Sequence, residues 1–478
     1  MKPVLPVLAL SLLLASCAVG PDYKKAGVES ALVDKEWHAT LPHGGKMADL
    51  STWWSQFDDP VMTSLLTDAE TSSPTLDAAL ARVNQSRASL RVNNAALLPT
   101  VAGNASTTRA RSAASGFAVE QTASIASLDA GWELDLFGGK RRAIEQSTAQ
   151  LQSSEAGWHD ARVTLAAEVA DAYVSLRACE SDVDLYTRRL KSQSDTRDLV
   201  NLKVNAGFAS RSDGDLSEAS AADAASTLEN QKGVCAQRFN LLAQLTAVPA
   251  ATLQQRLAAA TGAVPSPRNA DVTTVPADTI QQRPDIAAAE RNLAAASAAI
   301  GVAEAERYPS LSLGGAIGIN KANGSSSLST WSFGPSLSLP LFNGGALKAE
   351  ADRTRAVLDE TVAAYRSAVR LAVNEVEDAL ARLDAVDRRT ENAEQAVDRY
   401  RKYLAAMDSN YKAGVASLLD LEEARRTVYS SEETLITVRQ EQAQAWIALY
   451  KAVGGGWNGQ YDVPGEITSA VSLQTETK

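Results

Sequence analysis

The sequence contains three cysteines, and their places indicate which covalent chemistry the chain could undergo. Cys17 directly follows Leu14-Ala15-Ser16, where the apolar stretch Val4–Leu14 ends. That stretch is too short to cross a bilayer, and small residues before such a cysteine are typical of a bacterial lipoprotein signal peptide. We therefore expect residues 1–16 to be removed and Cys17 to carry the lipid. The alternative is an ordinary secretory signal with an incidental cysteine.

Cys179 and Cys235 are placed symmetrically about a predicted turn. Cys179 precedes Gly207 by 28 residues, and Cys235 follows it by 28. In an antiparallel helical hairpin that turns at Gly207, the two side chains lie at the same level. An exported chain enters an oxidising compartment, so we expect a disulfide between them. The alternative is a pair of small buried side chains.

Side chains for enzymatic or metal chemistry are sparse. His38, His43 and His159 are scattered, and no His or Cys cluster has the spacing of a metal site. Gly138-Gly139-Lys140 lacks the earlier glycine and the following Ser or Thr of a phosphate-binding loop, and no Gly-x-Ser-x-Gly elbow occurs. The net charge of −11 disfavours nucleic acid. We expect no enzyme, no cofactor, no metal site and no nucleic-acid partner.

The elements that must position any functional residue come in two copies. Each copy reads as a proline turn, alternating strands, a glycine stop, a very long helix, an Ala-Gly tip and a shorter return helix. Offsets of 205 to 210 residues relate the copies, as expected for a duplicated unit. The corresponding segments are Pro99 and Pro309, Leu136–Gly139 and Leu341–Gly345, Asn205–Ser210 and Lys412–Ser417, and Ala247-Val248 and Ala452-Val453.

Two segments of each copy alternate between apolar and polar residues, as strands with one wet face do. The predicted strands are Val101–Arg111, which alternates weakly, Leu128–Leu136, Leu311–Asn320 and Trp331–Leu341. A soluble sandwich would also alternate, but here each pair of strands runs into a helix of unusual length. Bacterial membrane barrels have at least about eight strands, and open edges are not tolerated in lipid. We therefore expect several chains to share one barrel.

The predicted helices are very long. Lys140–Val204 contains one glycine and no proline, and Ala346–Lys412 contains neither. Apolar residues recur at steps of three and four with charged residues between them, which favours packing in a coiled-coil-like layer. The return helices are predicted at Asp213–Leu245 and Ser417–Val453. Such charged helices belong in water, which here is the periplasm.

Several motifs, in this order along the chain, resemble one family. They are Cys17 followed by Val19–Tyr23, Trp53-Trp54 with Phe57–Pro60, and Arg283-Pro284-Asp285 leading into Ala288–Glu290. The chain resembles the outer-membrane factors of Gram-negative tripartite efflux pumps, in the NodT/OprM-like lipoprotein branch of the TolC superfamily. The resemblance covers essentially the whole mature chain.

The resemblance implies a mixed α and β membrane protein. In this homotrimer, four strands per chain build an outer-membrane β-barrel, which a long periplasmic α-helical barrel with an equatorial belt continues. The implied divisions are a signal peptide (1–16), an N-terminal equatorial segment with a first helix (17–94), the first copy (95–248), an equatorial connection with a helix (249–304), the second copy (305–453) and a C-terminal equatorial tail (454–478).

The resemblance also implies a passive exit duct, lipid-anchored in the outer membrane. An inner-membrane RND-type pump would deliver drugs, toxic small molecules or ions to it through a periplasmic adaptor protein. Ala18, rather than aspartate, follows Cys17, which favours the outer membrane. Two alternatives stay open: the duct of a type I protein secretion system, which would share the fold, and a non-conducting trimeric structural lipoprotein. Polar strand faces disfavour the latter, because a stalk needs no lumen.

By the same resemblance, the gate lies at the periplasmic tips. Tyr411 resembles the constriction tyrosine, Asp420 and Glu423 the acidic ring, and Asp213 the partner carboxylate. In a trimer these acids would crowd around the lumen, attract cations and raise the pKa of some carboxyls. From spacing alone, they would merely stabilise the start of a helix.

Two departures from the family pattern concern the gate. Ala416 stands where the family has an arginine, so that clasp is absent or replaced, with Arg211 as the candidate. Glu423 stands where an aspartate is usual, which keeps the charge on a longer side chain.

Small residues at both tips are candidates for docking the adaptor, because they let its helices approach closely. Glycine at a helix end also simply makes the turn. The candidate positions are Gly207, Phe208, Ala209, Ser210, Gly414, Val415, Ala416 and Ser417.

Overall fold

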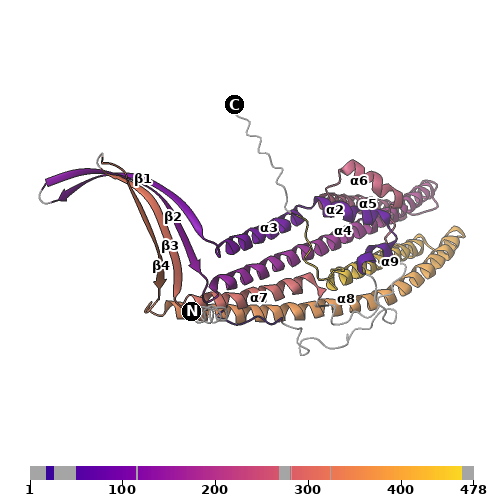
Figure 1. Cartoon of the computed structure of the whole chain (residues 1–478). Coiled ribbons are helices and arrows are strands. Elements are labelled where there is room, and N and C mark those ends of the chain that lie inside the picture. Colours follow the sequence, from indigo (N-terminus) through magenta and orange to yellow (C-terminus); the bar gives the residue numbers. More distant parts are fainter. Residues whose placement is uncertain are drawn as a thin grey trace.

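The computed structural model describes residues 18–25, 50–114, 117–267, 280, 282–322 and 325–465. A curved sheet lies at one end of an elongated molecule, and long helices run from it to two tips at the other end (Figure 1). The described part is mostly helical, with a single four-stranded antiparallel sheet.

The order helix, strand, strand, long helix and return helix occurs on both sides of residue 267, with further short elements in the first part. The first part contains η2 (Leu50–Phe57), α2 (Pro60–Ser72), α3 (Pro74–Ala95), β1 (Thr100–Ala114), β2 (Phe117–Leu134), α4 (Gly139–Asn205), α5 (Arg211–Thr246), α6 (Ala250–Leu257) and η3 (Ala258–Ala260). The second contains α7 (Pro284–Ala305), β3 (Ser310–Ala322), β4 (Leu328–Ser338), α8 (Ala346–Lys412) and α9 (Leu418–Ala452). α4 and α8 have 67 residues each, and α3 and α7 have 22 each.

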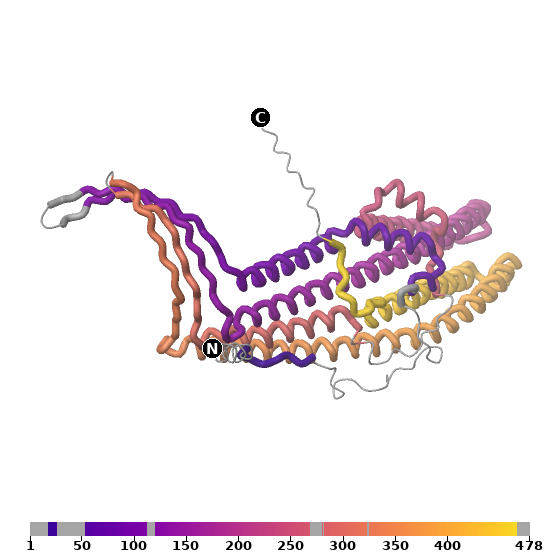
Figure 2. Tube along the Cα trace, in the orientation of Figure 1, coloured from indigo at the N-terminus to yellow at the C-terminus, as the bar shows by residue number. Residues whose placement is uncertain are grey.

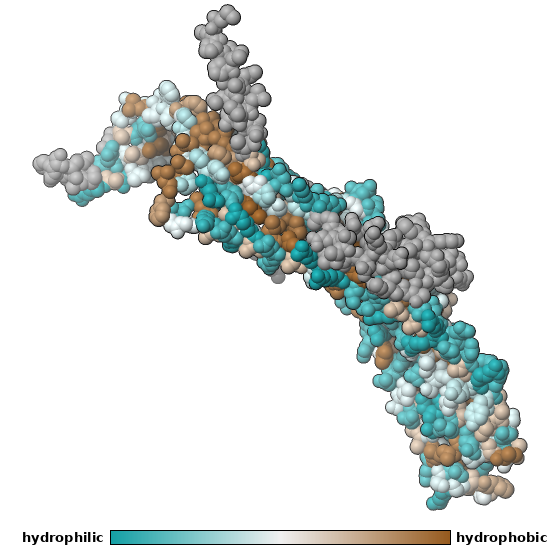
Figure 3. Space-filling view, turned by 90° about the horizontal axis from the view of Figure 1, so that it is seen from below, coloured by the Kyte–Doolittle hydropathy of each residue, from teal (hydrophilic) through white to brown (hydrophobic). Residues whose placement is uncertain are grey.

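The strands pair in sequence order, β1-β2-β3-β4, so β1 and β4 form the two edges. Leu128 of β2 stands opposite Ile317 of β3, which stands opposite Trp331 of β4. All three side chains are exposed, Trp331 to 80%. Because side chains alternate along a strand, this row marks one apolar face of the sheet. Figure 3 shows hydrophobic side chains gathered at the sheet end of the molecule.

All four strands differ at their ends from the sequence prediction, most of all β2, which begins at Phe117 and not at Leu128. For two strands the prediction runs past the C-terminal end. β4 ends at Ser338 and not at Leu341, because Pro340 has no amide hydrogen to donate to a ladder. β2 ends at Leu134 and not at Leu136, because Asp135 turns to cap α4 instead. The Asp135 carboxylate accepts from the amides of Lys140 and Arg141 at 3.0 Å each, and these hydrogen bonds help lower its pKa despite its partial burial.

The main core lies where α2, α4 and α9 meet, away from the tips. Trp53 and Trp446 are fully buried, with ring centroids 5.7 Å apart. Asp59 caps α2 through one carboxylate oxygen and accepts from the Tyr173 hydroxyl through the other, at 2.7 Å. This links the Trp-Trp motif and its acidic neighbour to α4, so these motif residues serve packing.

The Arg283-Pro284-Asp285 motif joins the start of α7 to the end of α9 and to the middle of α8. Pro284 starts α7, and Arg283 donates to the carbonyl oxygen of Ala452 at 2.8 Å and to Glu375 at 2.7 Å. Asp285 holds the same guanidinium at 2.8 Å. Arg283 thus fixes three helices relative to one another although they are far apart in sequence.

The N-terminal segment lies along the helices near the base of the sheet (Figure 2). The Val19 amide donates to the carbonyl oxygen of Phe137 at 3.0 Å. Gly20 lies so close to Gly301 of α7 that a Cβ at Gly20 would come within 2.4 Å of that backbone. Among helices in the described ranges, none has a stretch both long enough and apolar enough to span a bilayer.

Candidate functional site

The two tips end their long helices with the same local motif. α4 ends before Gly207, which has φ +77°, and the Phe208 amide donates to the Lys203 carbonyl oxygen at 2.7 Å. α8 ends in the same way before Gly414, which has φ +74°. A glycine in the left-handed region closes the last turn of each helix, which is the turn-forming role expected of these residues.

Each return helix then starts with a reciprocal cap. The Ser210 hydroxyl accepts from the Asp213 amide at 3.1 Å, and the Asp213 carboxylate accepts from the Ser210 amide at 3.3 Å. Ser417 and Asp420 repeat this arrangement at 3.2 and 2.9 Å. Asp213 and Asp420 therefore satisfy free amides at helix starts, as the spacing alone predicted.

The cap also acts on the charge of Asp420. A hydrogen bond from the Ser417 side chain, and then one from the Ser417 amide, lower the pKa of Asp420 because they stabilise its ionised form. Within this chain, the direction is therefore opposite to the rise expected from crowding. Glu423 is exposed and pairs with Arg426 at 3.4 Å. Arg211 is exposed, and with the described residues it forms no ion pair.

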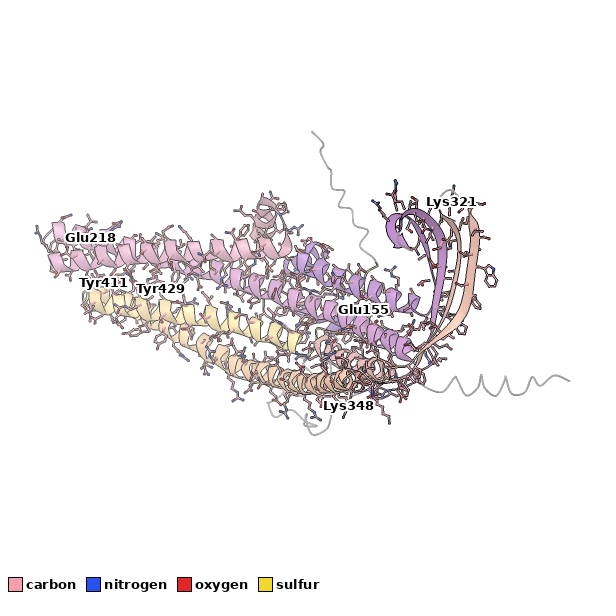
Figure 4. The ribbon with its side chains drawn as sticks, turned by 90° about the vertical axis from the view of Figure 1, so that its left-hand side faces the viewer. Glu155, Glu218, Lys321, Lys348, Tyr411 and Tyr429 are labelled. Carbon is pink, nitrogen blue, oxygen red and sulfur yellow. A yellow bond between two sulfur atoms is a disulfide. The ribbon has the colours of Figure 1, made fainter. Side chains whose placement is uncertain are left out.

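Tyr411 contacts a lysine from the other tip. Lys203 Nζ, in the last turn of α4, donates to the Tyr411 hydroxyl at 3.3 Å and lies 4.6 Å from the ring centroid. One cation thus makes a hydrogen bond and a cation–π contact. Asp213, expected as the partner carboxylate of the gate, is engaged with Ser210 within this chain. Figure 4 shows Tyr411 at the tip and Tyr429 farther back along α9.

We name α4 with α5 hairpin 1, and α8 with α9 hairpin 2; they meet along a seam between α4 and α9. Polar side chains cross this seam at several levels. In order towards the tips, the pairs are Gln444 and Asp171 at 2.7 Å, Gln440 and Ser175 at 3.3 Å, Glu432 and Arg188 at 3.2 Å, and Glu422 and Gln193 at 2.6 Å.

Two buried glutamates of the seam were missed in the sequence. Glu432 accepts from Arg188 of α4 and from Arg401 of α8, at 3.2 and 2.5 Å. Glu422 accepts from Gln193 and pairs with Arg425 at 2.8 Å. On a charged helix both look like ordinary surface residues. The one available signal is the i, i+3 spacing of Glu422 and Arg425.

The candidate docking residues lie at the surface of the tips. Phe208 is 84% exposed and Val415 is 79% exposed, so the turn of each tip presents an apolar side chain to solvent. Gly207 and Gly414 are exposed, and Ala209 and Ala416 are half-buried. The tips are therefore accessible in this chain.

Cys179 and Cys235 form a disulfide that joins α4 to α5, with Cα atoms 5.6 Å apart. Cys17, the predicted lipid attachment site, lies outside the described residues. A metal site would need clustered ligands, and the described residues contain no group of three or more His, Cys, Asp or Glu that could hold an ion.

Comparison with known proteins identifies the family. The model of the outer membrane efflux protein family matches residues 65–248 and 275–455. The chain is 33% identical to nodulation protein T of Rhizobium leguminosarum bv. viciae, over 94% of this chain and 92% of that protein. It is 29% identical to TtgC, a probable efflux pump outer membrane protein of Pseudomonas putida, over 99% of both chains. The solved outer-membrane channel OprN has 28% identity and a TM-score of 0.80, over 92% of this chain and 100% of that chain.

The matched ranges include all four strands, both hairpins and both tips. The family is one of channels and not of enzymes. The family resemblance of the sequence motifs is thereby confirmed, as is the outer-membrane location. The chain belongs to the outer membrane efflux protein family and acts as an efflux channel of the outer membrane.

Proposed function

We propose that three copies of this chain form the exit duct of a tripartite efflux system. The observation that carries this proposal is a sheet whose edge strands, β1 and β4, have no outer neighbour within the described chain. The row of Leu128, Ile317 and Trp331 adapts one face of that sheet to lipid. Because lipid does not tolerate open edges, strands of further copies must pair there. Three copies supply twelve strands, above the lower limit of about eight for a bacterial barrel.

The same proposal includes a duplicated chain. Equal lengths of α4 and α8, and the shared glycine ending and Ser-Asp cap of both tips, support a duplication. In the trimer, the two hairpins of each chain would build a helical barrel in the periplasm. The segments before β1, between α5 and α7, and after α9 would form the equatorial belt.

Lipid on Cys17 fits the arrangement of the mature N-terminus. The Val19 amide donates to the carbonyl oxygen of Phe137, which follows β2. Arg142 donates to the carbonyl oxygens of Val19 and Gly20, and it pairs with Asp22 at 2.7 Å. Cys17 is two residues from Val19, so its acyl chains would enter the membrane beside the strands.

The tips are the proposed contact with a periplasmic adaptor, which connects the duct to an inner-membrane pump of the RND type. Phe208 and Val415 are apolar and exposed, and the residues around them are small. An adaptor helix could cover both without displacing a bulky side chain. TtgC, which is similar over nearly the whole chain, is itself named as part of an efflux pump.

The gate is proposed at the same tips, where the contact of Lys203 and Tyr411 holds hairpin 2 against hairpin 1. Lys203 would then do what the arginine absent at Ala416 does elsewhere in the family. Asp420, Glu423 and Asp213 would face the narrowed lumen and favour cations. Arg211, the other candidate to replace that arginine, would pair with a neighbouring chain of the trimer.

Native mass spectrometry of the complex extracted from outer membranes in mild detergent tests the duct. A mass of three lipidated chains is expected. A monomer or dimer would contradict the shared barrel and remove the basis for a gate. For the gate itself, Lys203→Met should raise the closed-state conductance in planar bilayers. Lys203→Arg retains the cation, so its closed-state conductance should stay at the wild-type level.

A further inference from the structure

A carboxyl group away from the tips lies in the seam between the hairpins. Asp182 is half-buried on α4, and its Oδ2 accepts a hydrogen bond from Gln231 Nε2 of α5 at 3.3 Å. Its Oδ1 is buried and meets no hydrogen-bond donor among the described residues. An ionised oxygen in this position has lost its water without gaining a partner, which is unfavourable.

The surroundings of Asp182 cannot easily supply a second donor. The Gln231 amide nitrogen also lies 3.3 Å from Cys179 Sγ, to which it donates. The disulfide between Cys179 and Cys235 fixes α5 at this level. Gln231 is therefore shared between two acceptors on a helix that cannot slide.

The charge that faces Asp182 is also negative. Glu433 approaches from α9, where Tyr429 and Ile436 on either side of it pack against the cluster around Tyr186 of α4. From α5 the facing group is the neutral Gln231. Burial, and then the charge of Glu433, raise the pKa of Asp182 to about 6.

Two cations close to Asp182 or Gln231 in sequence are engaged elsewhere. Lys232, next to Gln231, pairs with Glu229 at 2.8 Å on the surface of α5. Arg189 of α4 lies 3.7 Å from Asp223. Neither contributes to the environment of the Asp182 carboxyl.

We propose that Asp182, facing Glu433, is a proton-binding site of the seam: it takes up one proton when hairpin 2 packs on hairpin 1 and releases it when the hairpins separate. A neutral Asp182 does not repel Glu433 and loses less by burial. In the separated state water solvates both carboxylates, so the proton leaves. The packing of the seam does not depend on the proposed duct; only its effect on conduction rests on that function.

The direction of the pH effect follows from the two proton affinities. The packed seam binds the proton more tightly than the separated one, whose carboxyl has an ordinary pKa of about 3.9. Packing is therefore strengthened as the pH falls through about 6, and the gain is complete below about 4. Between pH 7.5 and pH 5.0, the equilibrium constant for packing should rise about tenfold.

Hydrogen–deuterium exchange of the full chain in detergent, corrected for intrinsic rates, tests the site. In α9 peptides around Glu433, protection should be about tenfold higher at pH 5.0 than at pH 7.5. Asp182→Asn, which is neutral at both pH values, should remove this difference. The control Asp195→Asn, an exposed acid of α4 that pairs with Lys191, should keep it.

Glu433→Gln gives a second, independent variant in case Asp182→Asn does not fold. Removing that charge should move the midpoint to lower pH. Equal protection of the wild type at both pH values, or an unchanged pH dependence in a folded Asp182→Asn, would overturn the proton site. Bilayer conductance at the same pH values adds the link to function: a wild type that forms no pore would refute the duct and leave the exchange result standing.

Discussion

Hairpin 1 and hairpin 2 share their lengths and their turns, yet they are fastened differently. Hairpin 1 is closed by the disulfide of Cys179 and Cys235. Hairpin 2 has no such bond between its described helices, and its buried Glu432 binds Arg401 of its own α8 and also Arg188 of hairpin 1. Hairpin 1 is thus fixed internally, whereas hairpin 2 shares its buried Glu432 with its neighbour.

The comparison shows which parts of the fold can vary without changing the backbone. The glycine ending and the Ser-Asp cap determine the turn of each tip and are the same in both. The contacts between helices determine which elements move together, and these differ. Hairpin 1 should therefore behave as one rigid body, while the position of hairpin 2 depends on charges and protons at the seam.

The largest effect should come from opening the covalent hairpin. Cys179→Ser combined with Cys235→Ser should lower the free energy of unfolding of hairpin 1 by about 4 kcal/mol, because the disulfide closes a loop of intermediate length in the unfolded chain. The residues are 56 apart in sequence. Hydrogen exchange should show the loss in α5 and not in α9. An equal loss in both hairpins would contradict the idea that each is fastened separately.

The next effect should come from Glu432→Gln. Replacing a buried carboxylate that binds two arginines should weaken the seam by about 2 kcal/mol, less than for a fully buried pair because both arginines are half-exposed. Exchange at neutral pH should rise along α9 while α5 stays protected. Glu441→Gln, which breaks an exposed pair with Arg389, is the matched control and should cost at most about 1 kcal/mol. Similar results for the two variants would show that Glu432 is not a fastening of the seam.

The smallest effect should come from the caps, where the hairpins are alike. Ser417→Ala and Ser210→Ala should each destabilise the first turn of their helix by about 1 kcal/mol. Since the pKa of Asp420 is lowered, its share of the cap is present at neutral pH and is lost as the pH falls through that lowered value, below 3.8. Acid titration of exchange in the first turn of α9 would reveal it. Protection of this turn that did not fall on acidification would contradict the contribution assigned to Asp420.

The sequence predicted the elements well where a local pattern defines them. Lys140–Val204 was predicted for the helix that spans Gly139–Asn205, and Ala346–Lys412 was predicted as it is found. Glycines and periodic apolar residues mark these limits within the sequence itself. The end of β4 was wrong by three residues, because the apolar alternation continues past the point where Pro340 ends the ladder.

The site could be predicted only in part. Asp420 and Asp213 were singled out by the family resemblance, with stabilisation of a helix start as the alternative, and the structure places both in caps. The contact of Lys203 and Tyr411, and the environment of Asp182, depend on which helix faces which and at what height. A lysine in a last helical turn or an aspartate within a charged helix is common, so nothing local distinguishes these residues.

The placement of the disulfide has a consequence for biogenesis. Cys179 and Cys235 both belong to one hairpin, and the bond involves neither the strands nor a second chain. Thiol oxidation can therefore be completed on a single newly exported chain, before any barrel is assembled. A cell that lacks its dithiol-oxidising machinery would export chains whose hairpin 1 has no disulfide. The defect would be seen as degraded or misassembled protein and not as a faulty pore.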